Sequence, residues 1–299
     1  MGDRHESDER KPSEHLIIPY APDDRGRSDQ RPLPGTLSGP PVAWSCPSLI
    51  VDGQPGTYVP GSPLKTLVVV RNYGFGGVPA PATVTLWWAE PSTGFSVLNL
   101  LGQASVAVPP DGRDHSAGPI DGFIPASAPP HLCLIAMVSG LTDRPVKDPA
   151  SGKIIIDPVG DRHFAQHNLN AINVASGRFD FGFFAGNPLA EPARFIVRAR
   201  AVPERALAPL SITMGMEPAQ ADGLDLDLRV LDGDGPEAEE SGDRIAFDLR
   251  PGVRRRVLLS GRLPPPPPGR FVAAQILQDR DDGRGEGRLI GGVGVLLFG

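Results

Sequence analysis

Apolar and polar positions alternate most regularly in residues 64–90. Residues 65–72 are dense in β-branched side chains, which fit the pleated, half-buried surface of a strand. Residues 73–81 are rich in glycine and proline, and a helix could not cross them. In residues 82–88, apolar side chains at every second position predict a strand with one face in a core. Two strands and a turn cannot bury this surface alone, so we expect flanking segments to supply a facing sheet.

Short apolar runs separated by turn signals predict two series of strands. The first series comprises residues 48–51, 104–108, 118–123, 132–138, 153–157 and 163–174. The second comprises residues 178–184, 193–201, 226–231, 245–249, 254–260, 271–278 and 289–298. The run LCLIAMV is apolar throughout, which predicts a strand buried on both faces. We therefore predict an all-β chain of two tandem immunoglobulin-like antiparallel β-sandwiches, residues 43–174 and 175–299.

Residues 1–42 mix charges of both signs with serine, proline and glycine, which predicts a disordered tail before the first sandwich. One apolar island interrupts this composition, and it contains Leu16, Ile17, Ile18 and Tyr20. The island has two interpretations. It is a docking peptide that binds a partner, or it is a strand that folds back onto its own domain.

Composition agrees with an all-β chain and excludes several classes of partner. The 299 residues include 36 glycines and 35 prolines, which favour many turns and argue against a helical bundle. The formal net charge of −6 provides no basic field for phosphates, so we expect no nucleic-acid partner. No segment approaches the roughly 20 apolar residues of a membrane span.

The charged start MGDRHESDERK lacks the apolar region of a secretion signal, so we expect a cytoplasmic location by default. Export by a dedicated machine, or association with a particle, is the alternative. The two cysteines are Cys46 and Cys133. In a reducing compartment we expect no disulfide between them, and their spacing does not predict a zinc site.

The first predicted sandwich carries a series of short segments in a recognisable order. They are VDGQPG at residues 51–56, TLVVVRNYG at 66–74, LWWAEPSTG at 86–94, HLCLIAMV at 131–138 and DRHFAQHNL at 161–169. In this order and spacing the segments resemble the CARDB-like, immunoglobulin-like domains of bacterial surface, secreted and multidomain proteins. The resemblance implies a sandwich of about seven strands that serves as a spacer, adhesive or interaction module. It implies no catalytic residue.

No residue pattern predicts a catalytic, cofactor or metal site. His163 and His167 lie four apart, but the glutamate of a zinc protease is missing, and in a strand the two rings would stand about 13 Å apart. The acidic run at residues 232–237 has a proline where a calcium loop needs an oxygen ligand, so we interpret it as a solvated loop. The glycines at residues 291–294 lack a following helix that could hold a pyrophosphate.

The adjacent Trp87 and Trp88 must face opposite sides of their strand, and we assign Trp88 to the core face. Trp87 then contacts a protein partner, stacks on a sugar, or packs against the second sandwich. We predict a non-enzymatic structural or protein-interaction module, as a component or accessory of a larger bacterial assembly. The alternative is a carbohydrate-binding or adhesive module with a glycan partner. The sequence does not predict the oligomeric state.

Overall fold

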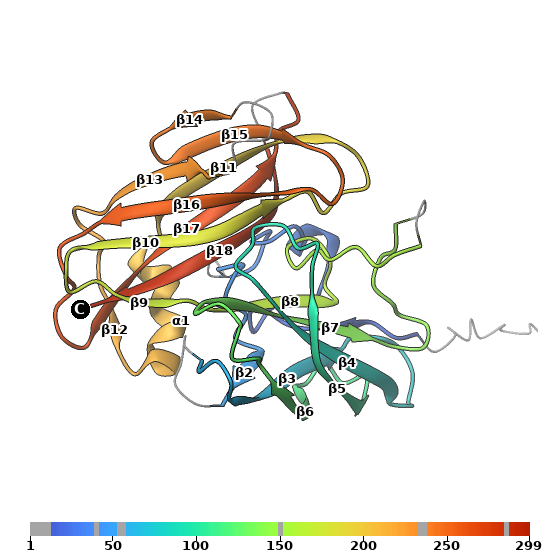
Figure 1. The fold of residues 1–299 in the computed structure, drawn as a ribbon. Helices are drawn as coiled ribbons and strands as arrows, with labels where there is room; N and C mark the ends of the chain where they lie inside the picture. The colour runs from blue at the N-terminus through green and yellow to red at the C-terminus, as the bar shows by residue number, and fades with distance from the viewer. Residues whose placement is uncertain (1–12, 39–41, 53–57, 149–151, 232–237, 284–286) are drawn as a thin grey trace, which may run out of the picture.

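The computed structural model describes residues 13–38, 42–52, 58–148, 152–231, 238–283 and 287–299. It confirms the all-β prediction, because mostly antiparallel strands build two sandwiches that lie against each other (Figure 1). The first sandwich comprises β1 (Leu16–Ile17), β2 (Leu49–Val51), β3 (Pro63–Asn72), β4 (Ala80–Ala89), β5 (Asn99–Val108), β6 (His115–Phe123), β7 (Leu132–Ser139) and β8 (Phe164–Leu169). A short 3₁₀ helix, η1 (Ser28–Gln30), lies in the segment after β1.

The first sandwich is built from two sheets. In one sheet β3 pairs with β6 along one edge. Along its other edge, β2 and β1 pair with successive stretches of β3. The second sheet has the order β5-β4-β7-β8. The facing side chains form a buried core, in which Val68, Val84 and Leu134 are completely inaccessible. The alternation in residues 82–88 therefore does place one face of β4 in a core.

The second sandwich takes up the rest of the chain. Its strands are β9 (Ala171–Asn173), β10 (Arg178–Gly186), β11 (Ala193–Ala201), β12 (Glu217–Pro218), β13 (Asp225–Val230), β14 (Glu239–Ser241), β15 (Arg244–Leu249), β16 (Arg254–Arg262), β17 (Arg270–Arg280) and β18 (Arg288–Phe298). A three-stranded sheet of order β10-β16-β13 faces a larger sheet of order β14-β15-β11-β17-β18-β9, with β12 beside β17. Among the strands of the described chain, only β12 with β17 and β9 with β18 pair in parallel. Alternating apolar residues put Phe181, Phe183 and Val257 into the core between them.

One helix, α1 (Glu204–Met214), follows β11 and has no counterpart in the sequence prediction. Gly215 ends it with a left-handed backbone (φ 60°), a conformation that glycine adopts without steric cost. Leu207 is fully buried in a small third core with Trp44 and Phe271. The helix is therefore held by packing against β17 and the chain segment before β2.

Strand β7 joins the two sandwiches into one unit. Leu134 points into the first core, whereas Ile135 and Met137 on the opposite face pack into the second. This confirms the prediction that residues 132–138 are buried on both faces. Polar contacts cross the same boundary, since the Gln166 side chain donates to the Gly292 carbonyl at 2.8 Å.

The N-terminal segment requires a correction. The sequence predicts a disordered tail up to residue 42, but residues 13–38 belong to the first sandwich. Leu16, Ile17 and Ile18 are 0% exposed, and they cover one edge of β3 and the open side of the core. Of the two interpretations of the apolar island, the strand that folds back is the one observed. Residues 1–12 lie outside the described part of the chain.

The strand predicted at residues 153–157 does not form. Ile154 makes one isolated bridge with Lys147, and the rest of the segment is a loop. Ile155 and Ile156 are half-buried, because they line the junction between the two sandwiches instead of extending a sheet. The acidic run at residues 232–237 lies outside the described residues.

Candidate functional site

Strand β10 forms an edge of the second sandwich that is open along half its length. In an antiparallel pair, successive residues point their backbone N–H and C=O groups alternately toward and away from the partner strand. The backbone groups of Phe184 point away from β16, since its N–H donates to the Pro91 carbonyl at 2.8 Å and its carbonyl accepts from the Thr93 N–H at 2.9 Å. The register with β16 is unbroken, so the backbone groups of Asp180 and Gly182 also point away from β16. No described group pairs with their backbone.

Gly182 leaves free space on this edge. A Cβ atom placed there would meet nothing within 4 Å, and both Asp180 and Gly182 are exposed. Glycine inside a strand weakens the strand and often marks a place where another backbone approaches closely. An unpaired edge of this kind is a template for a further strand.

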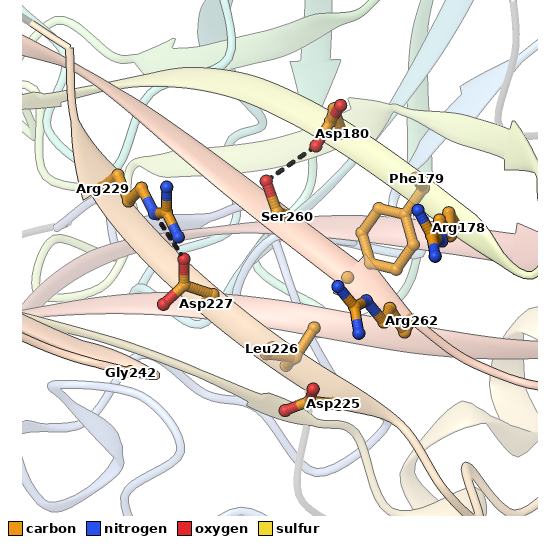
Figure 2. A pocket seen from close by; sticks show the side chains of 11 residues that line it. Arg178, Phe179, Asp180, Asp225, Leu226, Asp227, Arg229, Gly242, Ser260 and Arg262 are labelled. Carbon is orange, nitrogen blue, oxygen red and sulfur yellow. Dashed lines mark hydrogen bonds and ion pairs between the residues drawn. The ribbon is translucent and has the colours of Figure 1, made fainter.

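The outer face of the same sheet carries rows of charged side chains. The register places Arg178, Arg262 and Asp225 in one row across the three strands. The next row contains Asp180, whose carboxylate accepts from Ser260 at 2.7 Å, and Asp227. A hollow of about 750 Å³ lies over these rows, and most of its lining side chains belong to them (Figure 2).

The two arginines of the first row oppose each other directly across the strands. Within the described chain neither Arg178 nor Arg262 makes an ion pair, whereas Arg229 in the same hollow is paired with Asp227 at 2.7 Å. Like charges directly opposite each other destabilise a sheet. An incoming carboxylate beside Arg178 would relieve this repulsion.

A buried charge cluster holds the N-terminal segment in place. His163 Nδ1 lies 2.6 Å from Asp161, its Nε2 lies 3.1 Å from Asp143, and Arg162 binds Asp143 at 2.6 Å. Burial disfavours the charged ring, but the two carboxylates outweigh this penalty and raise the pKa of His163 above its ordinary value. Asp143 also accepts the backbone N–H of Leu16 at 2.6 Å.

This cluster is built for structure rather than for proton transfer. A general base needs a ring nitrogen within reach of the proton that it abstracts, but both nitrogens of His163 face carboxylates and its side chain is 3% exposed. His167 is also buried, and its Nδ1 lies 3.2 Å from the Cys46 carbonyl. The two histidines share no ligand. Among the described residues no group of three or more metal-ligating side chains gathers at one point.

The two cysteines lie in different cores. Cys46 packs in the first core and Cys133 in the second, and both are free thiols. Burial raises the pKa of each thiol to about 12, so neither is a reactive thiolate near neutral pH.

The structure does not bring the sequence-predicted partner-binding residues together on a surface. Leu16, Ile17 and Ile18 are inaccessible, and Tyr20 is 3% exposed with its hydroxyl donating to the Ala43 carbonyl at 3.0 Å. Trp87 is half-buried against the second core, which matches the third of its alternatives. Trp88 packs half-buried on the first core, the face assigned to it.

The comparisons with known proteins define no family for this chain. No protein-family model and no curated protein sequence matches it. Among solved structures, the collagen adhesin of S. aureus is similar over 83% of this chain and 91% of its own, with 7% identity and a TM-score of 0.23. Escherichia coli alpha-2-macroglobulin is similar over 84% of this chain, with 12% identity and a TM-score of 0.24, and this chain covers 22% of it. Likenesses at these TM-scores carry no argument about function.

The described helices offer no membrane span, because none is both long and apolar enough to cross a bilayer.

Proposed function

We propose that this protein is a non-enzymatic interaction module that captures an extended segment of a partner protein at the open edge of β10. The observation that carries the proposal is that the backbone groups of Asp180 and Gly182 face outward and have no partner among the described residues, whereas those of Phe184, the next outward-facing residue, donate to Pro91 and accept from Thr93. Addition of a strand to a sheet edge gives affinity through main-chain hydrogen bonds and specificity through alternate side chains. The resemblance of residues 43–174 to CARDB-like modules supports the same class of function.

The charges on the outer face predict the composition of the captured segment. A side chain opposite Arg178 lies beside a guanidinium group that makes no ion pair within the described chain, so an acidic residue fits there. The residue of the captured segment that lies opposite Asp180 should be basic. The residue opposite Gly182 can have a large apolar side chain, because the space beside this glycine is free. This pattern predicts that the edge selects its partner by sequence and does not pair with every extended segment.

Two other classes of function receive less support from the side chains. In the described chain the exposed aromatic residues are Phe75 and Phe123, at opposite ends of β3, and they form no platform on which a sugar could stack. Both ring nitrogens of His163 are held by carboxylates, so this cluster offers no base for an enzyme. The proposal therefore ranks a protein partner above a glycan.

Selection from a displayed library of 12-residue peptides on the full chain tests the proposal. We expect the selected peptides to protect the amides of Asp180 and Gly182 from solvent exchange. Gly182→Pro should weaken their binding at least tenfold, because the edge then lacks an N–H donor. Gly182→Ala, which keeps the N–H, is the matched control and should retain binding. Selected peptides that leave both amides unprotected, or a selection that yields none, would overturn the proposal.

A further inference from the structure

A cavity of about 430 Å³ lies where three parts of the molecule meet. Residues 26–31 of the N-terminal segment form one side, and residue 146 together with residues 155–162 of the first sandwich forms the second. Residues of the second sandwich, among them Leu189 and Ile290, close the third. Its volume falls within the range of small-molecule sites, which often lie at the interfaces between domains.

One wall of the cavity is apolar. Ile155, Ile156 and Leu189 are half-buried there, and Val146 is 59% exposed although it lies at the cavity. No described side chain fills the space in front of them. Covering this wall would remove apolar surface from water, at about 25 cal/mol per Å².

The opposite side of the cavity is rich in arginine. Arg31 is paired with Asp24 at 2.8 Å, with side-chain exposures of 6% and 0%, and Arg162 is paired with Asp143 at 2.6 Å. The charges of these two arginines are therefore already balanced. Two further arginines at the cavity, Arg27 and Arg288, are exposed.

Those two arginines are available to a ligand. Arg27 makes no ion pair among the described residues, and Arg288 makes one long, largely exposed ion pair, 3.8 Å from Asp157, that an incoming anion can share. Both oxygens of Asp161, the other acid in the cavity, are already occupied by Val146 N–H and His163. The free charge facing the cavity is therefore positive.

We propose that this cavity binds a small amphipathic organic anion. Its hydrocarbon part would cover the apolar wall, and its charged head would pair with Arg27 and Arg288. Because such a ligand touches the N-terminal segment and both sandwiches, it stabilises their association. The site is independent of the edge of β10.

Octane-1-sulfonate is the test probe, and neutral 1-octanol is its control, because the two share a hydrocarbon chain and differ in charge. Calorimetric titration of the full chain measures the affinity for each compound, and the thermal unfolding temperature with each compound present measures the stabilisation. We expect the sulfonate to bind at least tenfold more tightly than the alcohol and to raise the unfolding temperature. Equal affinity for the two compounds, or binding of neither, would overturn the proposal.

Variants at the cavity locate the binding. Arg27→Gln combined with Arg288→Gln should weaken sulfonate binding at least tenfold without changing the unfolding temperature of the free protein, since both side chains are exposed. Arg113→Gln, in the exposed turn before β6, is the charge-matched control and should bind as the wild type does. Asp157→Asn should strengthen binding several-fold, because it removes a carboxylate that competes for Arg288. Loss of binding in the Arg113 control, or no loss in the double variant, would show that the anion binds elsewhere.

Discussion

The two sandwiches differ in whether an edge strand is covered. In the first sandwich, the edge of β3 beyond β2 is covered by the chain's own N-terminal strand, whose side chains are inaccessible to solvent. In the second, the edge of β10 is covered only near Phe184, by residues 91–93, and is open at Asp180 and Gly182. The strand that covers the first edge is apolar, whereas the open edge carries alternating charge and a glycine.

The two edges differ in what holds a strand against them. Strand β1 is anchored by backbone pairing with Arg71 and Asn72, by burial of Leu16, and by a charge cluster behind it. The edge of β10 offers the same backbone groups, but its side-chain contacts must come from charges on the outer face. We infer that β1 is permanent structure and that β10 is a reversible binding edge.

A pair of proline variants should produce the largest contrast between the two edges. The N–H of Ile18, just after β1, points away from β3, and the N–H of Gly182 points away from β16. Among the described residues only the Ile18 N–H has an acceptor, the Arg162 carbonyl at 3.1 Å. Ile18→Pro should cost about 3 kcal/mol or more, because it also removes a fully buried side chain. Gly182→Pro should cost about 1 kcal/mol or less. Urea unfolding measures both, and similar losses would show that the edges do not differ.

Replacement of His163 tests the cluster that holds the closed edge. Because the folded-state pKa of His163 is raised, its stabilisation is fully present below the unfolded value of about 6.5 and is lost as the pH rises through the folded value. His163→Gln should therefore cost about 1–3 kcal/mol at about pH 5.5 and less at about pH 9. Unfolding free energies at both pH values measure the difference. A cost that grows with pH would contradict the assignment of a charged ring.

Reversal of one charge on the open edge should have the smallest effect, and it should be favourable. Arg178→Glu replaces a like-charged pair with Arg262 by an opposite pair, which should add roughly 0.5 kcal/mol at low salt. Raising the salt concentration should reduce this gain, since both side chains are exposed. Arg178→Gln is the intermediate control. If the reversal lowers the stability, the two guanidinium groups already have partners in solution.

The strands were predictable from sequence because their signal is local. Alternation in residues 82–88 identified β4, and an unbroken apolar run identified β7 as buried on both faces. Helix α1 was missed because strand alternation was the pattern followed and because its sequence ERALAPLSITM contains an internal proline, although Leu207, Leu210 and Met214 recur at helical spacing. These residues pack with Trp44 and Phe271, which are distant along the chain.

The functional features depend on pairing between distant segments, and composition cannot supply this. The charged composition of residues 1–42 gives no sign that Leu16 pairs with Asn72, 56 residues further along the chain, and fills a core with Ile18. Conversely, little in the local sequence distinguishes β10 from a central strand. The one available signal was the glycine in the run DFGFF, because a strand-interior glycine often marks the approach of another backbone.

Amide hydrogen exchange, measured residue by residue on the free protein, shows whether the edge of β10 is open. We expect the amides of Asp180 and Gly182 to exchange without protection, while those of Phe181 and Phe183, which face β16, exchange slowly. The amide of Ile18, on the closed edge, should be as protected as theirs. Slow exchange at Gly182 would show that the edge of β10 is already covered in solution, and the account of it as a binding edge would be wrong.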